Sequence, residues 1–218
     1  ATAGGAGADI DLDTIDDDAN ATRRILTLDA GADGDVEIAG AVGGFLPLDT
    51  LDIDALDTSF GGDITADNLN VDGITRTVTL TADVDITVDN NDVDFSGAAS
   101  INGARDFGIF AGTGEVNLPD TGTTTALTEV DIVAGTFTGT TIDTRGAAGA
   151  AGGNVSITTT TGPLTLTGAV LADGGTVPAL QAGNDAGNVF LSAADTLSTI
   201  GITANGTAGA LGTGGDAG

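Results

Sequence analysis

Oxygen-bearing side chains crowd one short stretch of this sequence, "DVDITVDNNDVDF" at residues 83–95. Four carboxylate and amide side chains fall close together in its second half: Asp89, Asn91, Asp92 and Asp94. Ca²⁺ takes about six to eight oxygen ligands and favours carboxylates and amide carbonyls. The stretch therefore predicts a calcium site, although Val93 stands where an EF-hand loop has a ligand. No other cofactor is expected.

The acidity of the whole chain offers a second interpretation of the same aspartates. Of 218 residues, 32 are acidic and 5 are basic, which gives a formal net charge of −27. The aspartates would then form a solvated anionic coat, because at marine ionic strength, on the order of 0.5 M, the screening length falls to roughly 4–5 Å. Such a surface repels nucleic acid. Divalent cations and other copies of the chain are the expected partners.

Alternation of apolar and acidic residues predicts a strand at the start of this stretch. Val84, Ile86 and Val88 fall on one face of an extended chain and the aspartates between them on the other. After Asn90–Asn91 the alternation shifts by one residue, which predicts a corner between two strands. Similar strand patterns recur along the chain, at residues 8–13, 34–40, 51–55, 77–83, 129–133, 154–158 and 164–168.

Internal repeats predict how these strands are arranged. Residues 26–55 resemble residues 107–134, and "GGNVSI" at 152–157 returns as "AGNVFL" at 186–191. Short strands with Gly corners, repeating at about 32 residues, are typical of a solenoid whose coils bury their apolar faces against one another. We therefore predict an all-β protein, a right-handed parallel β-helix (β-solenoid). Tandem immunoglobulin-like β-sandwiches are the alternative, and these normally carry a buried aromatic residue of a kind that this sequence lacks.

The solenoid is expected to fill residues 1–218 as a single domain. Coils are predicted to be less regular over residues 1–145, and Gly/Ala-rich repeats of about 32 residues are predicted over 146–218. The sequence contains no Met, even at position 1. We therefore expect it to be one segment of a longer repetitive chain.

Three strand and turn units carry a resemblance to a known family: "DGDVEIAGAVGGFLPLDTLDIDA" at 33–55, "GGDITADNLNVDG" at 61–73 and "GAAGAAGGNVSITTTTGPLTLTGAVLADGG" at 146–175. They resemble the repeat region of filamentous-haemagglutinin-type exoproteins and related autotransporter passengers. Those proteins are large bacterial surface adhesins. The resemblance implies a β-helical segment that is secreted to the cell surface and takes part in cell adhesion or biofilm formation.

Groups for catalysis are sparse in this sequence. It contains no His, Lys or Cys, so the usual pairing of a nucleophile with a base cannot be assembled. Acid pairs such as Asp83 and Asp85 could in principle serve as the two carboxyl groups that flank the cleaved bond in a glycosidase, but an aspartate-rich chain contains such pairs by chance. We predict that the protein is not an enzyme.

A structural role fits these observations best. We predict a segment of a secreted, extracellular fibrous adhesin or filament, in which the β-helix is a rigid stalk that contacts other copies or other cell-surface components. No apolar run of about 20 residues appears, so no membrane-spanning segment is expected. The alternatives are a surface-layer or sheath protein of a halophile, and a carbohydrate-binding or carbohydrate-cleaving β-helix.

Overall fold

The computed structural model describes residues 7–16, 23–72, 76–177, 181–209 and 214–218. All regular elements in these ranges are strands, and none is a helix. In the first half they are β1 (Ile10–Leu12), β2 (Ile25–Asp29), β3 (Val36–Ile38), β4 (Leu48–Asp54), β5 (Asp57–Phe60), β6 (Ile64–Asp72), β7 (Thr77–Leu80), β8 (Val84–Val88), β9 (Val93–Asp94), β10 (Ser100–Asn102) and β11 (Asp106–Phe110). In the second half they are β12 (Glu115–Leu118), β13 (Asp120–Thr121), β14 (Glu129–Ala134), β15 (Thr136–Gly139), β16 (Ile142–Asp143), β17 (Asn154–Thr159), β18 (Leu164–Leu166), β19 (Ala169–Leu171), β20 (Val189–Ser192), β21 (Leu197–Ser198) and β22 (Gly201–Thr203).

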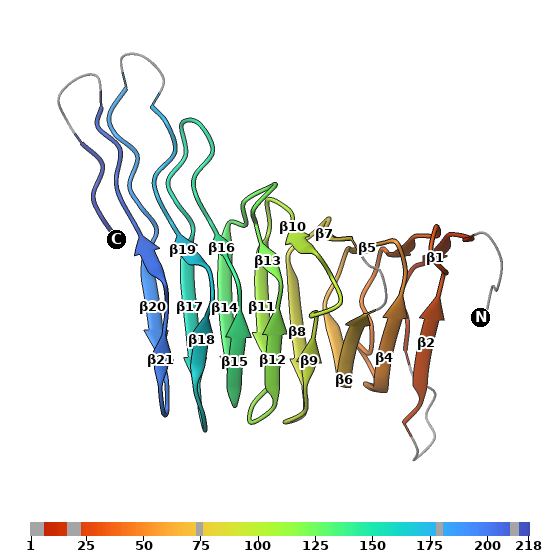
Figure 1. Ribbon diagram of the computed structural model, residues 1–218. Helices are drawn as coiled ribbons and strands as arrows, with labels where there is room; N and C mark the ends of the chain where they lie inside the picture. The colour runs from red at the N-terminus through yellow and green to blue at the C-terminus, as the bar shows by residue number, and fades with distance from the viewer. Residues whose placement is uncertain (1–6, 17–22, 73–75, 178–180, 210–213) are drawn as a thin grey trace.

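The strands form two parallel sheets that face each other along an elongated molecule (Figure 1). One sheet has nine strands, in the order β1-β3-β5-β7-β10-β13-β16-β19-β22. The other has 13 strands and includes β20-β17-β14-β11-β8-β6-β9-β12-β15-β18-β21. From β7 onward the chain places one strand in the first sheet and then two in the second, and repeats this order. The fold is therefore an all-β parallel solenoid, as predicted. Immunoglobulin-like sandwiches are the wrong alternative, because their sheets are antiparallel.

The predicted corner after Val88 is confirmed, and it divides the larger sheet into two columns. The beginning of β6 pairs with β8, while Leu69 and Asn70 later in the same strand pair with β9. Asn90, between β8 and β9, has a φ of 59°, in the left-handed region that Asn tolerates better than most residues. From this corner onward each coil has three strands instead of two, because it contributes two strands to the larger sheet in place of one.

Three interior rows of residues run through the whole solenoid, with one residue in register from each coil. The Leu26 row is Leu26, Leu51, Leu69, Val93, Val116, Phe137, Leu164 and Leu197. The Ile15 row is Ile15, Val42, Ile64, Ile86, Ile109, Ile132, Ile157 and Leu191. The Ile10 row is Ile10, Val36, Thr58, Val78, Ile101, Thr121, Ile142, Val170 and Ile202. Stacking of like residues at the spacing of neighbouring strands, about 4.8 Å, explains how a thin core is filled with few large rings.

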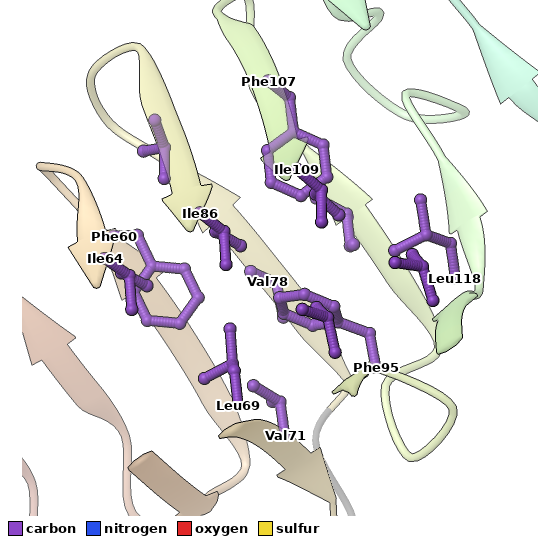
Figure 2. Packing of buried hydrophobic residues seen from close by; sticks show 14 of the residues in the cluster. Phe60, Ile64, Leu69, Val71, Val78, Ile86, Phe95, Phe107, Ile109 and Leu118 are labelled. Atoms are coloured by element: carbon purple, nitrogen blue, oxygen red, sulfur yellow. The ribbon is translucent and has the colours of Figure 1, made fainter. Parts of the chain in front are cut away.

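Side chains from both sheets meet in this interior (Figure 2). Phe95 and Phe107 pack edge to face, with ring centroids 6.4 Å apart. Phe60 and Phe137 are also buried, whereas Phe45 and Phe190 are exposed. The aromatic residues therefore serve mainly as core, as their apolar strand positions suggested.

The C-terminal repeat is confirmed by the pairing of the strands. Val155 pairs with Val189, so the repeated stretches at 152–157 and 186–191 lie one coil apart. The longer match between residues 26–55 and 107–134 is wrong as an alignment of coils. It equates Val36 with Val116, but β3 belongs to the nine-stranded sheet and β12 to the larger one. The error arose because the strands of both sheets begin with the same sequence pattern, a Gly and an acid before Val.

Gly-rich loops extend from the C-terminal coils beyond the ends of the strands (Figure 1). Backbone hydrogen bonds join successive loops, such as Gly146 N to Asp173 O and Gly174 N to Asn205 O, both 2.9 Å. A Cβ on Gly175 would lie 1.8 Å from the Ala147 carbonyl oxygen. Glycine is therefore required here because neighbouring backbones approach too closely for a side chain.

Candidate functional site

The four predicted calcium ligands lie on the outer surface of the corner between β8 and β9. Asp89, Asn91 and Asp92 are exposed, and Asp94 is partly buried. Their carboxylates accept separate hydrogen bonds: Asp89 from the Asn90 side chain at 3.0 Å, Asp92 from the Glu115 backbone at 2.8 Å, and Asp94 from the Ser96 backbone at 2.8 Å. These hydrogen bonds support the predicted corner, but each carboxylate is bonded to a different partner.

A calcium site at this corner stays a prediction. Within the part of the chain that the structure describes, no group of three or more Asp, Glu, His or Cys residues is arranged to hold a metal ion. Asn90, which the prediction left out, has the more central role in the geometry of the corner. Its Oδ1 accepts the backbone N–H of Thr113 in the next coil at 3.2 Å.

The bond from Asp92 belongs to a set that recurs along the solenoid. In each case an Asp or Asn directly before an inward-facing residue accepts the backbone N–H of the equivalent residue in the next coil, at 2.8 to 3.2 Å. We call these the inter-coil side-chain bonds. Their acceptors and donors are Asp9 and Asp35, Asp57 and Thr77, Asp63 and Asp85, Asp83 and Asp106, Asp92 and Glu115, Asp120 and Thr141, and Asn154 and Asn188.

These bonds give many aspartates a structural role that the sequence analysis missed. The signal was present, since an Asp or Asn precedes the first interior residue of many strands. A carboxylate that accepts a backbone N–H forms a charge-assisted bond, which is stronger than a neutral one. Asp is favoured over Glu because its short side chain reaches the neighbouring backbone without losing much conformational freedom.

The pKa of Asp120 shows the effect of one such bond. Burial raises the pKa of this carboxyl, but the hydrogen bonds that it accepts, among them one from the Thr141 backbone at 3.1 Å, outweigh burial and hold the pKa below its usual range. The ionised form of Asp120 is therefore the form that the fold stabilises.

Acidic side chains also surround a shallow hollow of about 320 Å³ on the outer face of the larger sheet. Gly108 is one of the residues that line it, in register with Asp85 on one side and Asp131 on the other. A Cβ on Gly108 would lie 2.1 Å from the Asp85 Oδ1, so the missing side chain leaves room for this carboxylate. The other acids around the hollow are Asp63, Asp83, Asp106 and Glu129.

The electrostatics of this hollow disfavour the ionised form of Asp85. Burial raises the pKa of Asp85, and repulsion by Asp63, Asp131, Asp106 and Asp83 raises it further. This is the cost expected when like charges occupy neighbouring strands. Asp85 and Asp120 therefore have pKa shifts of opposite sign, because one meets mostly carboxylates and the other mostly hydrogen-bond donors.

A larger hollow, about 690 Å³, lies where the Gly-rich loops rise beside β13 and β16. Its charged members are Arg145 and Asp143. Arg145 Nε donates to the Asp143 carboxylate at 3.0 Å, and the Asp143 side chain is 3% exposed. The hydrogen bond from Arg145 to Asp143, together with their opposite charges, raises the pKa of Arg145. The remaining lining residues are small, mainly Gly, Ala and Thr, and none is aromatic.

Comparisons of the chain with protein-family models, with curated proteins and with solved structures found no match. The class of protein therefore follows from the fold alone, a parallel β-solenoid. The described residues also contain no helix with the length and apolarity needed to cross a bilayer.

Proposed function

We propose that the chain is a structural segment of a secreted, cell-surface fibrous adhesin or extracellular filament, in which the solenoid is a rigid stalk. The observation that carries this proposal is the continuity of the three interior rows from the first described coil to the last. Their middle members are almost completely buried, with Val93, Ile109 and Ile101, one from each row, at 0% exposure. A fold of this kind holds two points apart at a fixed distance.

The bonding between coils supports the rigidity of the stalk. Each coil is joined to the next by the parallel strand ladder and by the inter-coil side-chain bonds. Bending would stretch these bonds on one side of the solenoid and compress the packed interior rows on the other. Protein interiors resist such compression because they are close-packed.

The anionic surface supports an extracellular location in salt-rich water. Most carboxylates face outward, and the net charge is −27. We propose that dissolved cations, including divalent cations such as Ca²⁺, screen or bridge these rows of acids. The strand spacing of about 4.8 Å supports this proposal, because a cation between two coils could interact with a carboxylate of each.

Surface labelling tests the proposed function. An antibody raised against the chain should label intact cells that produce it, or fibres shed from them, and brief protease treatment of intact cells should remove the label. An antibody against a cytoplasmic protein serves as the control for cell integrity. Labelling that appears only after lysis would contradict a cell-surface role.

The hollow beside Arg145 supports carbohydrate binding as a second candidate function. An arginine and several threonine hydroxyls border it, and these groups can donate hydrogen bonds to a sugar acid. A glycan array would test this candidate. Saturable glycan binding that is lost in Arg145→Ala would favour this candidate, while binding that is unchanged in this variant would mean that glycans bind to another surface.

A surface-layer protein of a halophile is the remaining alternative, and ordered sheets in a purified envelope would favour it.

A further inference from the structure

The connections that lead from the nine-stranded sheet to the larger sheet lengthen in the middle of the solenoid. The connection between β13 and β14 covers residues 122–128, and the next one, between β16 and β17, covers residues 144–153. We call the second of these the first long loop. Leu127 N donates to Asp143 O at 3.1 Å and joins the two connections at their base, beyond which the first long loop extends further from the strands (Figure 1). Both connections lie within the described range 76–177.

One edge of the first long loop is paired with the loop of the following coil. Gly149 N donates to Thr176 O, and Gly175 N donates to Ala150 O, both at 2.9 Å. Residues 173–176 therefore bond to this edge through their backbone, as a neighbouring strand does in a sheet.

The opposite edge of the first long loop has no partner in the part of the chain that the structure describes. Gly146 and Gly152 direct their N–H groups to the following loop. Successive residues of an extended chain direct these groups to alternate sides, so the N–H groups of Ala147 and Ala151 face the preceding coil. Neither of them makes a hydrogen bond to the protein.

The hollow of about 690 Å³ lies on this unpaired side. Ala147 and Ala151 line it together with residues 123–125, which are exposed. Arg145 and Asp143 are the charged residues of its lining, and they pair with each other, so the lining carries no net charge. Ligand pockets in proteins typically have volumes of about 300–1,000 Å³, and this hollow is within that range.

The paired edge indicates which kind of segment fits the unpaired one. Its partner, residues 173–176, includes Gly174 and Gly175. A Cβ on Gly175 would lie 1.8 Å from the Ala147 carbonyl oxygen, because the two backbones approach closely. A segment on the unpaired edge approaches the same backbone from its other side, so glycine and alanine fit best there. The net charge of −27 disfavours an acidic segment.

We propose that the unpaired edge of the first long loop, above the hollow beside Arg145, binds an extended glycine- and alanine-rich segment of a partner polypeptide. The segment takes the place that a longer connection at residues 122–128 would fill. Its carbonyl groups accept the N–H groups of Ala147 and Ala151. In this mode, strand addition to an exposed edge, main-chain hydrogen bonds supply the affinity. The inference goes beyond the proposed stalk, because it gives the solenoid an attachment site on its side.

A synthetic peptide with the sequence of residues 146–153, acetyl-GAAGAAGG-amide, is the probe. This sequence already pairs with a glycine-rich loop within the chain. Titration of the peptide into the nitrogen-15-labelled chain should shift the NMR signals of the Ala147 and Ala151 amides and slow their hydrogen exchange. The peptide acetyl-GPPGPPGG-amide is the control and should not bind, because proline has no N–H to donate.

Two tryptophan substitutions test whether the peptide occupies the hollow. Thr124 lines the hollow and is exposed, and its backbone N–H donates to Asn102 Oδ1 at 2.9 Å, a bond that a side-chain substitution leaves in place. Thr124→Trp fills the hollow with an indole and should weaken peptide binding at least about tenfold. Thr138→Trp is the matched control, because Thr138 is exposed on β15 and does not line the hollow. Circular dichroism verifies the fold, and Thr123→Trp replaces Thr124→Trp if the latter is unfolded.

Each outcome decides the inference. Shifts at Ala147 and Ala151 that are lost in Thr124→Trp and kept in Thr138→Trp support it. Signals that do not move at millimolar peptide overturn it, as do equal losses in both variants or equal binding of the proline peptide. Shifts caused by trigalacturonate and not by the peptide would assign the hollow to carbohydrate and would also overturn it. Surface labelling of intact cells is independent of all these results, so failure of this inference leaves the proposed stalk in place.

Discussion

At the scale of single residues, the aspartates have at least two different roles. Those directly before the first interior residue of a strand accept a backbone N–H from the next coil, as Asp92 does from Glu115. Those in the middle of a strand face outward beside other acids, as Asp85 does in register with Gly108 and across from Asp131. The first kind stabilises the coil stack, and the second kind opposes it through repulsion.

Substitution of Asp92 separates the role of an acceptor from that of a charge. Asp92→Ala should lower the free energy of unfolding by about 1 kcal/mol, because the Glu115 N–H loses its side-chain partner. Asp92→Asn should cost less, since the amide oxygen can still accept this bond. Urea unfolding followed by circular dichroism measures both, with Asp33→Ala in an exposed turn as the control. Equal losses for the Ala and Asn variants would show that the charge, and not the bond, is important.

The opposite pKa shifts of Asp85 and Asp120 predict opposite responses to pH. Because the folded-state pKa of Asp120 is lowered, its contribution to stability is present above the unfolded pKa and is lost as pH falls through the folded value. The pKa of Asp85 is raised, so its ionisation costs stability as pH rises above the unfolded value.

Melting curves of the two Asn variants at neutral and acidic pH measure this difference. Asp85→Asn should raise the melting temperature at neutral pH and change little in acid, where the wild-type carboxyl is protonated. Asp120→Asn should lower the melting temperature at neutral pH, and this loss should shrink in acid. Shifts of the same sign for both variants at neutral pH would contradict the environments described for these carboxyls.

Thr58 interrupts the Ile10 row and offers another test at this scale. It is 2% exposed, and its hydroxyl has no hydrogen-bond partner. Thr121 in the same row is also buried, but its hydroxyl donates to the Pro119 carbonyl at 3.1 Å. Thr58→Val should therefore raise the free energy of unfolding by about 1 kcal/mol, whereas Thr121→Val should leave it unchanged or lower it. A destabilised Thr58→Val variant in urea unfolding would refute the assignment of an unsatisfied hydroxyl.

At the scale of elements, the strands were predictable because each has an apolar face and an acidic or hydroxyl face. The stretches at 34–40, 77–83 and 154–158 became β3, β7 and β17. The assignment of a strand to one sheet or the other was not predictable in the first half, since strands of both sheets share one local pattern. In the C-terminal coils the long Gly-rich loops distinguish one position from another, which is why the repeats there were aligned correctly.

The Gly-rich loops carry a prediction of their own. A Cβ on Gly175 would lie 1.8 Å from a carbonyl oxygen of the neighbouring loop, whereas a Cβ on Gly201 would meet nothing within 4 Å. Gly175→Ala should therefore destabilise the C-terminal coils by about 1–3 kcal/mol, the usual cost of overpacking. Gly201→Ala is the matched control and should be neutral. Hydrogen exchange of the loop amides would locate the effect, and unchanged protection in Gly175→Ala would show that the loops are not packed against each other in solution.

At the scale of the whole molecule, the fold was predictable and the use of its charge was not. A thin core with few aromatic residues and a repeated strand pattern already favoured a solenoid over sandwiches. The sequence could not show which acids bond to a neighbouring coil, because that depends on the lateral register of strands about 20 to 34 residues apart. It also could not show that Asp92, in the corner at residues 89–94, is bonded to the next coil, since its partner Glu115 lies 23 residues further along the chain.

Salt dependence is the property of the whole chain that tests these ideas together. The net charge is −27 and neighbouring coils are about 4.8 Å apart, so repulsion between carboxylates should lower the stability of the fold at low ionic strength. Sodium chloride at about 1 M shortens the screening length to about 3 Å and should raise the melting temperature measured by circular dichroism.

Calcium at low ionic strength should raise the melting temperature more than sodium of equal ionic strength if carboxylates of adjacent coils share an ion. Asp92→Asn should reduce that calcium increment if the predicted corner site is real, while Asp33→Asn should not. A melting temperature that is independent of both salts would show that the inter-coil side-chain bonds outweigh the repulsion and that the acidic surface needs no cations.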